Sequence, residues 1–437
     1  MINQVKNSMF FKELTTKGKV YFVGGSVRDS FLNIPSKDID LLVSGIEIEK
    51  LKTILTPFGT VNSVGASFSV LKFKPFELNL KEPIDIALPR KEIKIGEKRT
   101  DFKIISDPAM TIEDDLIRRD FTINSIALDS NLNIIDPFNG LEDLKKEIIR
   151  MTNAEHFLED ELRFLRAIRF ATRFDFIMAI DTFNAIISNT ESLRKISKER
   201  IQDEFMKILG GKNPVRGIQL LMRTHLIEEI LPELENCEGI EQNKFHSKDV
   251  LGHILDVVGN AKPTAIHRLT ALLHDIAKPE CKTVTETGIH FYDHHIKSMD
   301  VAKNFMTELK FSNDEIDLVT TTIKNHMVFM DEASRNPRVV RRWRMKLGEE
   351  KFNFLLDLME ADVKSCNDKR NWVEDLRTMQ IVEKPILILP VDGNDIMTLF
   401  NIKPGPKVKE LKDMVIDMVC ENPDITKEEV IEKLKTL

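Results

Sequence analysis

The sequence predicts an α+β protein, in which an N-terminal α/β segment with a mixed sheet is followed by segments that are entirely helical. Residues 1–140 alternate short apolar strand patterns with helical patterns, and from residue 141 onward apolar residues recur at helical spacing. A chain of 437 residues is too long for one core, so roughly two to four domains are expected. We predict domains at residues 1–140, 141–240, 241–375 and 376–437.

The composition is that of a soluble globular protein, with 42% hydrophobic and 30% charged residues. No long uncharged apolar run predicts a membrane span, and the N-terminus lacks the apolar core of a secretory signal. The four cysteines have no CxxC spacing, which indicates a reducing compartment and argues against a zinc ribbon. We therefore expect a cytoplasmic protein. Because the net charge is −7, a nucleic-acid partner would need a local basic patch.

The stretch from Val20 to Val43 predicts a strand, a glycine turn, a helix, a loop and a second strand. Val20–Val23 is a short run of β-branched and aromatic residues. Gly24 and Gly25 allow a sharp turn and a close approach of the backbone to a ligand. Ser26 is the expected N-cap of the helix, so that the first amides would face a phosphate lying over the glycines.

Two carboxylates begin the second strand. Asp38 and Asp40 are two residues apart, so we expect them on the same face. Their repulsion needs a reason, and the usual one is a divalent cation, most often Mg²⁺ with phosphate oxygens. Together, the glycine turn and this pair predict a metal and nucleotide site, although each pattern alone is weak.

Further elements of the first predicted domain, residues 1–140, follow in order. We expect a helix around Ile46–Leu55 and two strands near Val61–Phe73. Asp85 is the single charge inside the short apolar strand PIDIALPR, and it is either an edge-strand aspartate or a third carboxylate of the metal site. Residues 91–107 are polar and predict a loop. The charged RRD at residues 118–120 is commonly a helix start.

The helical pattern EDELRFLRAIRFATRF carries a basic stripe beside an apolar stripe. Arginines recur there at spacings of three and four, namely Arg163, Arg166, Arg169 and Arg173. A solvated stripe is the ordinary interpretation of one isolated helix. However, the stripe contains no lysine, and the planar fork of arginine favours recognition of phosphates or base edges.

Histidines are concentrated in the third predicted domain. Eight of the ten fall between His246 and His326. One histidine on an apolar helix is usually a core residue, but several with an adjacent aspartate favour a metal site of imidazoles and carboxylates. Asp362 is a further oxygen ligand to consider. In the tail, Pro404 and Pro406 predict a helix start, and Thr426 with Glu429 predicts a capping box for the last helix.

Ten motifs occur in one order along nearly the whole chain: GGSVRD, DID, IDIALPR, RRDFTIN, DPFNGLEDL, EDELRFLRAIRF, HSKDVLGH, LLHD, DHH and NHM. In this order they resemble bacterial tRNA nucleotidyltransferases, the CCA-adding enzymes of the poly(A)-polymerase-like class, with an appended HD domain. The resemblance implies a nucleotidyltransferase head at 1–140, a neck at 141–240 that selects the nucleotide and binds RNA, an HD domain at 241–375 and a helical tail. It implies template-independent addition of C, C and A to the 3′ end of tRNA from CTP and ATP, with release of pyrophosphate.

The resemblance also implies roles for residues in the head and neck. Asp38 and Asp40 would hold Mg²⁺, with Asp85 as the third catalytic carboxylate. The predicted nucleotide-binding residues are Gly24, Gly25, Arg28 and Arg119 around the triphosphate, and Asp160 and Arg163 at the base edge, with Arg166 and Arg169 nearby. One aspartate and one arginine supply the fixed acceptors and donors that choosing C and A over G and U requires. The helical segments would hold the tRNA acceptor arm.

The HD segment resembles metal-dependent phosphohydrolases, in which this layout has phosphatase and 2′,3′-cyclic phosphodiesterase activity. The implied ligands of a second divalent metal are His253, His274, Asp275 and His294, with His326 or Asp362 as further candidates, whereas His246 would be a supporting or substrate group. The segment departs from the family pattern at two places. Asp293 replaces a small residue, and His295 replaces a glutamate.

Other activities stay open. Bacterial poly(A) polymerase shares the head and neck, but it typically has a basic GRRF-like stretch where this chain has Gly65-Ala66-Ser67-Phe68. An A-only or CC-only adding enzyme is a second alternative. An alternative of another class is an HD phosphohydrolase whose head is only an RNA-binding module. The intact aspartate pair, together with Asp85 and Arg28, argues against it.

Overall fold

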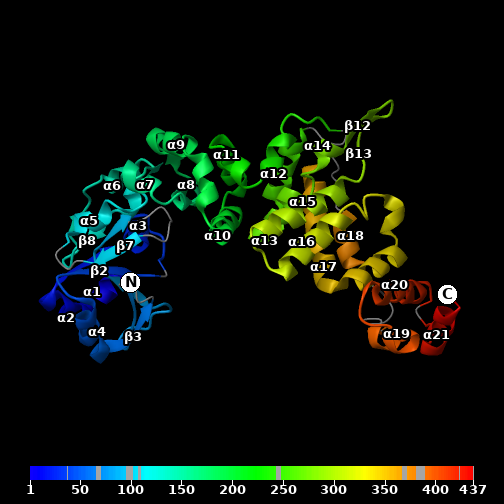
Figure 1. Cartoon of the computed structure of the whole chain (residues 1–437), viewed down its shortest axis with the longest axis horizontal. Coiled ribbons are helices and arrows are strands. Elements are labelled where there is room, and N and C mark those ends of the chain that lie inside the picture. The colour runs from blue at the N-terminus through cyan, green and yellow to red at the C-terminus, as the bar shows by residue number, and fades with distance from the viewer. Residues whose placement is uncertain are drawn as a thin grey trace. The chain divides into compact units, whose positions relative to one another are not determined.

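The computed structural model describes residues 1–36, 38–64, 70–94, 102–106, 110–242, 248–366, 372–379, 389–422 and 424–436. These form two compact units (Figure 1). The first comprises Met1–Ile196 with Thr224–Leu226, and the second comprises Ser197–Arg223 with Ile227–Leu437. The further division into neck, HD segment and tail stays a prediction.

The first unit is built on a mixed seven-stranded sheet with the strand order β3-β4-β5-β2-β1-β8-β9. β2 and β5 are parallel, and the other neighbouring strands are antiparallel. The strands are β1 (Lys19–Val23), β2 (Asp40–Ser44), β3 (Gly59–Val64), β4 (Val70–Pro75), β5 (Ile84–Ala87), β8 (Ala127–Leu128) and β9 (Ile134–Ile135). Two separate pairs are β6 (Arg90–Lys94) with β7 (Phe102–Ser106), and β10 (Ile148–Ile149) with β11 (Ile177–Met178).

Helices bury both faces of this sheet. The helical elements of the first unit are α1 (Ile2–Asn7), α2 (Met9–Lys17), α3 (Gly25–Phe31), α4 (Ile48–Leu55), η1 (Thr56–Phe58), α5 (Ile112–Leu116), η2 (Thr122–Asn124), α6 (Gly140–Lys145), α7 (Ala154–Leu158), α8 (Leu162–Phe174), α9 (Ile180–Ile187) and η3 (Thr190–Lys195). Phe11 of α2 stacks on Phe22 of β1 at 5.1 Å between ring centroids. The next residue of β1, Val23, packs with Ile112 and Leu116 of α5. Successive strand residues therefore point into two different apolar layers.

The register of the sheet places the predicted head residues at one end of three neighbouring strands. Val23, the last residue of β1, pairs with Asp40, the first residue of β2, and Asp40 pairs with Asp85 of β5. After Val23 the chain turns at Gly24, whose φ of +73° suits glycine and few other residues. This turn and the two aspartates therefore meet at the same edge.

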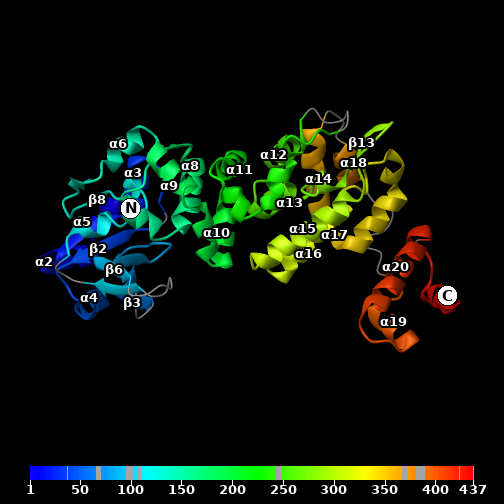
Figure 2. The same ribbon diagram turned by 45° about the horizontal axis from the view of Figure 1, so that its top comes forward.

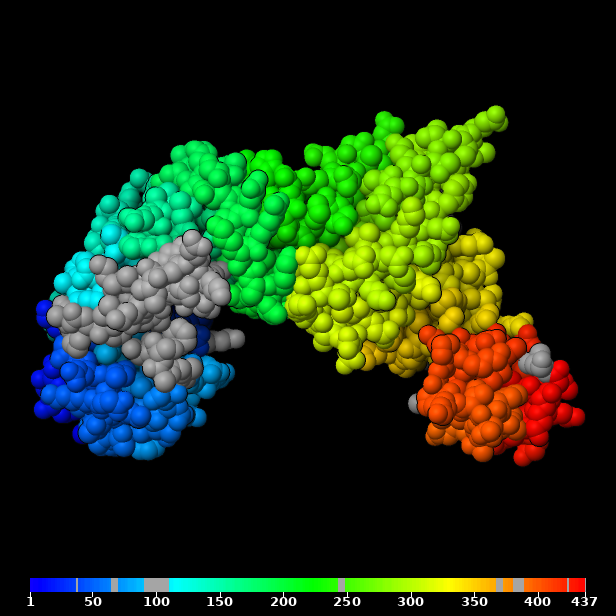
Figure 3. All heavy atoms as spheres, viewed as in Figure 1, coloured from blue at the N-terminus to red at the C-terminus, as the bar shows by residue number. Residues whose placement is uncertain are grey.

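The second unit is almost entirely helical. Its elements are α10 (Lys198–Leu209), α11 (Pro214–Arg223), η5 (Pro232–Cys237), α12 (Val250–Asn260), α13 (Ala265–Leu273), α14 (Lys278–Cys281), β12 (Lys282–Thr285), β13 (Gly288–Phe291), α15 (His294–Glu308), α16 (Asn313–Asn325), η6 (Glu332–Arg335), α17 (Pro337–Ser365), α18 (Trp372–Thr378), α19 (Gly393–Phe400), α20 (Pro406–Glu421) and α21 (Lys427–Lys435); η4 (Leu226–Glu229) precedes η5. The helices α12, α13, α15, α16 and α17 pack against one another (Figure 2). The hairpin β12–β13 projects from the surface of this unit (Figure 3).

Several sequence predictions are confirmed. The chain is α+β with a mixed sheet in its head, and α4 and the strands β3 and β4 occur where the pattern predicts them. Pro406 is at the start of α20, and the Thr426–Glu429 capping box begins α21. Within the described residues, no helix is both long and apolar enough to cross a membrane.

Three local predictions are wrong. The N-cap of α3 is Gly24, and Ser26 lies inside the helix, where its hydroxyl donates to the Val23 carbonyl at 3.2 Å. Asp38 lies before β2 and not in it. β2 pairs with β1, and the pairing stops at Asp40 because its partner Val23 is the last residue of β1 before the chain turns. The predicted loop at 91–107 contains most of the β6–β7 pair, since antiparallel backbone bonding does not require apolar side chains. Residues 65–68 and His246 lie outside the described residues.

Candidate functional site

The head site is centred on Asp40, which lies against the Gly24 turn. A Cβ atom at Gly24 would lie 2.9 Å from Asp40 Oδ2 and 3.3 Å from Arg119 Nη1. Any side chain other than hydrogen would therefore enter the space beside the carboxylate. Glycine at this position keeps a carboxylate and a guanidinium close to the backbone of the turn.

The charge of Asp40 is poorly compensated. Burial raises the pKa of the Asp40 carboxyl to about 6, and the neighbouring Asp85 and Asp38 charges add to this effect, whereas Arg119 opposes it. Asp85 is partly compensated, because its Oδ1 lies 2.9 Å from Lys72 Nζ across the β4–β5 pair. Asp38 is exposed, just before β2. The three predicted carboxylates thus lie at one end of the sheet, where the charges of Asp38 and Asp85 act on Asp40, but in the described residues their oxygen atoms do not form a group within 4.8 Å of one another. A cation would relieve their repulsion.

Arg28 lies beneath the glycine turn. Its guanidinium is buried and donates to Asp29 Oδ1 at 2.6 and 2.8 Å and to Asn124 Oδ1 at 2.6 Å. It also packs on the ring of Phe174, 4.8 Å from the centroid. A Cβ atom at Gly25 would lie 3.4 Å from Arg28 Nη2. Arg28 therefore joins the turn to η2 and to α8.

The RRD segment takes part in three further ion pairs, which involve two buried aspartates. Asp115 accepts from Arg118 at 3.1 Å and from Arg119 at 2.8 Å. Asp120 accepts from Arg166 at 2.5 Å and from the Asn124 amide at 2.8 Å. Burial alone would raise the pKa of both carboxyls, but the arginine partners lower it below the ordinary value.

Asn124 connects these pairs, because its side chain accepts from Arg28 and donates to Asp120. The residue-level reasoning did not single it out. Its position within the RRDFTIN motif is the signal that points to it.

The start of α8 holds the residues predicted to read the base. Asp160 Oδ1 accepts from the Leu162 amide at 3.0 Å. Arg163 donates to the backbone carbonyls of His156 at 2.6 Å and Arg118 at 2.7 Å. These two bonds fix the direction of a partly buried guanidinium. The apolar stripe of α8 is buried as predicted. Arg163, Arg166 and Arg173 contact carbonyl or carboxylate oxygens of other elements, and Arg166, Arg169 and Arg173 also lie over the rings of Phe170 and Phe174 in α8 itself.

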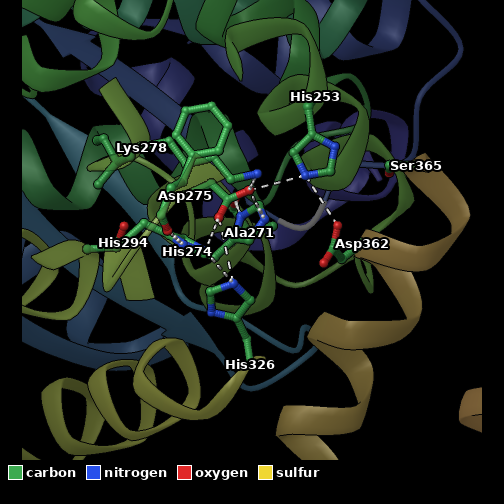
Figure 4. A network of polar contacts seen from close by, with 12 residues as sticks. His253, Ala271, His274, Asp275, Lys278, His294, His326, Asp362 and Ser365 are labelled. Carbon is green, nitrogen blue, oxygen red and sulfur yellow. Dashed lines mark hydrogen bonds and ion pairs between the residues drawn. The ribbon is translucent and has the colours of Figure 1, made fainter. Parts of the chain in front are cut away.

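The second unit brings six predicted ligands together from five places along the chain (Figure 4). His253 Nε2 lies 3.3 Å from Asp275 Oδ2 and 3.2 Å from Asp362 Oδ1. His274 Nε2 lies 3.1 Å from Asp275 Oδ2, and His294 Nε2 lies 3.2 Å from Asp275 Oδ1. His326 Nε2 lies 3.6 Å from the same Oδ1 atom. All six residues are buried.

Three of the imidazoles are oriented by backbone carbonyls. The Nδ1 atoms of His274, His294 and His326 each lie 2.7 Å from a carbonyl oxygen, of Ala271, Phe291 and Ile323 respectively. A carbonyl can only accept, so each Nδ1 carries the proton, and in the neutral ring Nε2 presents a lone pair. These lone pairs converge on the carboxylate of Asp275, which also presents lone pairs. The donor set fits a divalent cation of the type that imidazole and carboxylate ligands hold.

The charged groups around Asp275 also fit a site for a cation. His253 is buried, which lowers its pKa, but Asp275 and Asp362 reverse this effect and raise the pKa to about 9. Lys278, three residues after Asp275 in the sequence, forms an ion pair with it, and Lys278 Nζ lies 2.6 Å from Asp275 Oδ2. The sequence reasoning missed Lys278, although a lysine one helical turn after the aspartate was visible in LLHDIAK. His295 lies at the edge of this group, with its ring centroid 5.8 Å from that of His294.

Comparison with known families matches three parts of the chain. Residues 20–150 match the poly A polymerase head domain, and residues 175–238 match the "Probable RNA and SrmB- binding site of polymerase A". Residues 285–434 match domain 2 of tRNA nucleotidyltransferase. These matches cover the head site, the following helical segment and most of the second unit.

Whole-chain comparisons agree with these matches. The chain is 32% identical over 369 residues to a protein of Azoarcus sp. named multifunctional CCA protein, covering 81% of this chain and 86% of that protein. The fold resembles the crystal structure of the Bacillus stearothermophilus CCA-adding enzyme in complex with CTP, with a TM-score of 0.67, 24% identity and coverage of 98% and 95% of the two chains.

The Thermotoga maritima CCA-adding enzyme complexed with tRNA has a similar fold, with a TM-score of 0.59, 21% identity and coverage of 100% and 95%. At such identities the solved structures establish the fold, whereas the Azoarcus protein is similar in sequence over most of its length. The chain therefore belongs to the family of bacterial CCA-adding enzymes, the tRNA nucleotidyltransferases with a poly(A)-polymerase-type head.

Proposed function

We propose that this chain adds C, C and A to the 3′ end of tRNA from CTP and ATP without a nucleic-acid template. The observation that carries the proposal is the position of Asp40 against the Gly24 turn, with Asp85 on the neighbouring strand and Arg119 alongside. Carboxylates beside a turn without side chains suit a triphosphate that arrives with a metal ion. The family to which the chain belongs performs this reaction.

In this proposal Asp38, Asp40 and Asp85 hold Mg²⁺. When bound, the cation neutralises charge on the triphosphate and activates the 3′-hydroxyl of the RNA. Gly24 and Gly25 border the space for the triphosphate, and Arg119 faces that space beside Asp40. Arg28 supports the turn from beneath, since its guanidinium is buried against Asp29 and Asn124. Lys72 screens Asp85 until the cation binds.

Nucleotide choice falls to Asp160 and Arg163 at the start of α8. The two carbonyls that bind Arg163 fix its orientation, so the plane of its guanidinium has a defined direction. Arg166 and Arg169 lie one and two turns further along the same helix face. A fixed donor and acceptor reject a base that leaves them unsatisfied, which is the strongest form of discrimination open to a binding site.

The second unit supports a second activity, metal-dependent hydrolysis of phosphomonoesters or 2′,3′-cyclic phosphates. The supporting observation is that buried donor atoms form overlapping groups of three, in which Asp275 faces His253 and His274 through Oδ2 and His294 and His326 through Oδ1. His253, His274, Asp275, His294, His326 and Asp362 would hold the cation, which when bound supplies a nucleophilic water near neutral pH. Lys278 approaches the same Oδ2 atom of Asp275 that His253 and His274 face, and it compensates the charge of the carboxylate.

The addition reaction predicts a specific primer-extension result. With tRNA substrates ending before, within and after CCA, the wild-type protein should incorporate CTP and ATP in order and stop after A. Asp40→Asn and Asp38→Asn should abolish addition, because the cation loses ligands, while hydrolysis by the second unit should persist. Incorporation of ATP alone, with long tails on unrelated RNA, would instead assign the chain to poly(A) polymerase. Incorporation that stops after CC, or that occurs only on tRNA ending in CC, would indicate a partial enzyme.

The raised pKa of Asp40 predicts a pH-dependent gain in stability for Asp40→Asn. Below about pH 4 the carboxyl is protonated in both the folded and unfolded chains, so its burial costs little. As the pH rises from about 4 to about 6, the unfolded chain ionises this carboxyl while the folded chain keeps it protonated, so the folded state loses stability, up to about 3 kcal/mol before solvent screening. In a chelator, Asp40→Asn should therefore raise the Tm of the head at pH 7.5 and raise it clearly less at pH 4.5.

The matched control for this measurement is Asp38→Asn, because Asp38 is exposed in the same motif and its neutralisation should change the Tm little. Mg²⁺ should raise the Tm of the wild-type protein more than that of Asp40→Asn. Equal Tm values for wild type and Asp40→Asn at both pH values would contradict the buried charge.

Removal of Arg163 predicts a loss of nucleotide selectivity. Arg163→Ala should lower the ratio of kcat/KM for CTP and ATP over GTP and UTP by at least about tenfold, roughly 1.4 kcal/mol, with a smaller change in KM for the triphosphate. Arg173→Ala is the control, since Arg173 lies on the same stripe and pairs with Asp29. Arg163→Lys keeps the charge but loses the planar fork, so this variant should also have a lower selectivity for CTP and ATP. Unchanged selectivity in both Arg163 variants would remove the residue from this role.

The centre of the second unit predicts a separable hydrolase. His274→Ala and Asp275→Asn should abolish metal-dependent hydrolysis of 2′,3′-cyclic AMP and leave CTP and ATP addition within a few-fold of wild type. His290→Ala, on the projecting hairpin, serves as a histidine control that should keep hydrolysis. Hydrolysis that survives in both centre variants would show that another site is responsible.

A further inference from the structure

The histidine–aspartate centre has a sulfur atom at its edge. Cys366 follows the last residue of α17 as its C-cap, four residues after Asp362, and its Sγ lies 3.7 Å from Asp362 Oδ1. The donor atoms of His253, Asp362 and Cys366 all lie within 4.8 Å of one another. We propose that Cys366 is a thiolate ligand of this centre and that the centre accordingly takes a borderline-soft cation such as Zn²⁺ rather than Mg²⁺. The inference rests on the proposed metal centre of the second unit and adds a ligand to it.

The spacing of the three donor atoms fits shared coordination. Ligand atoms bound to one zinc ion at roughly 2.0–2.3 Å lie at most about 4.6 Å apart. The observed group, within 4.8 Å, therefore needs only a small adjustment to enclose one cation. His253 Nε2 and Asp362 Oδ1 are 3.2 Å apart, so the imidazole and the carboxylate already face the same point.

A second observation indicates that this region is built for a cation. His274 Nε2 is completely buried and makes no hydrogen bond within the described part of the chain, because Asp275 Oδ2, 3.1 Å away, is itself an acceptor. Asp275 Oδ1 is also buried and makes no hydrogen bond within the described residues, although imidazole nitrogens lie close to it. Buried polar atoms without partners are costly unless something else satisfies them. A cation held between the imidazoles and the carboxylates would satisfy both atoms.

The other three cysteines have surroundings of a different kind. The Sγ of Cys237 contacts the carbonyls of Glu233 and Ile276, and the Sγ of Cys420 lies 3.9 Å from Met345 Sδ. Cys281 is buried at the end of α14. Among the groups of three or more candidate ligands found in the described residues, Cys366 is the cysteine that takes part. A general preference for buried thiols does not explain its position beside a carboxylate and an imidazole.

The chemistry of binding is balanced without an oxidant or reductant. The Cys366 thiol loses its proton to solvent, and the sulfur donates an electron pair to the cation. The contact between Sγ and Asp362 Oδ1 is replaced by two bonds to the same ion, and His253 likewise releases any proton on Nε2. Thiolate sulfur favours Zn²⁺ and other borderline or soft ions, whereas Mg²⁺ prefers oxygen ligands. The added ligand therefore sets which metal the centre accepts.

The test is spectroscopic and uses the full chain loaded with Co²⁺. Wild type should show a thiolate-to-cobalt charge-transfer absorption in the near ultraviolet, and Cys366→Ser and Cys366→Ala should lose it. Cys281→Ser is the matched control and should keep the absorption. The affinity for Zn²⁺, measured by competition with a chelating dye, should fall at least about tenfold in the Cys366 variants and stay unchanged in the control.

A measurement on the wild-type chain avoids any effect of substitution on folding. Zn²⁺ should slow alkylation of Cys366 by iodoacetamide, located by mass spectrometry, and Mg²⁺ should not. Visible cobalt absorption that disappears in His253→Ala, without a charge-transfer band in wild type, would overturn the thiolate ligand and leave the metal centre standing. Absence of any cobalt binding would overturn both the thiolate ligand and the proposed centre.

Discussion

Buried carboxylates without enough positive partners are the constraint on which both units depend. In the head, Asp40 is held against the Gly24 turn, where burial raises its pKa to about 6. In the second unit, Asp275 is enclosed by imidazoles and one lysine. Taking a carboxylate out of water costs several kcal/mol unless a counter-charge replaces the lost hydration. In each unit the carboxylate therefore destabilises the folded state electrostatically, and a bound divalent cation would relieve this cost.

The other buried aspartates of the head differ from Asp40, because each forms an ion pair with an arginine. Asp29, Asp115 and Asp120 in the head are all buried, and each has an arginine within 2.5–2.8 Å. These pairs tie α3, the RRD segment and α8 into one framework. Asp40 lies among them with less compensation, although Arg119 stands nearby. Since the fold supplies arginines to structural aspartates, the carboxylate left short of charge marks the place where a ligand's charge enters.

The sequence predicted what is local and missed what folding brings together. The glycine turn, the aspartate pair and the arginine stripe of α8 could be found because each has a fixed spacing on one element. The order of the motifs pointed to the family. The N-cap could not be assigned reliably, since Gly24 and Ser26 both suit a helix start and the turn geometry decided between them. The salt bridge of Lys72 with Asp85 depends on strand register, which hydrophobic pattern alone did not specify.

The same limit explains the histidine centre. Asp362 contacts His253 although the two residues are far apart in the sequence, and Cys366 lies nearby because it is four residues after Asp362. Sequence spacing therefore suggested the ligands without separating Asp362 from His326, and it did not suggest the cysteine. The two centres differ in their donor atoms, oxygen in the head and mostly nitrogen in the second unit. Because hard and borderline cations prefer different donor types, the two centres would select different metals.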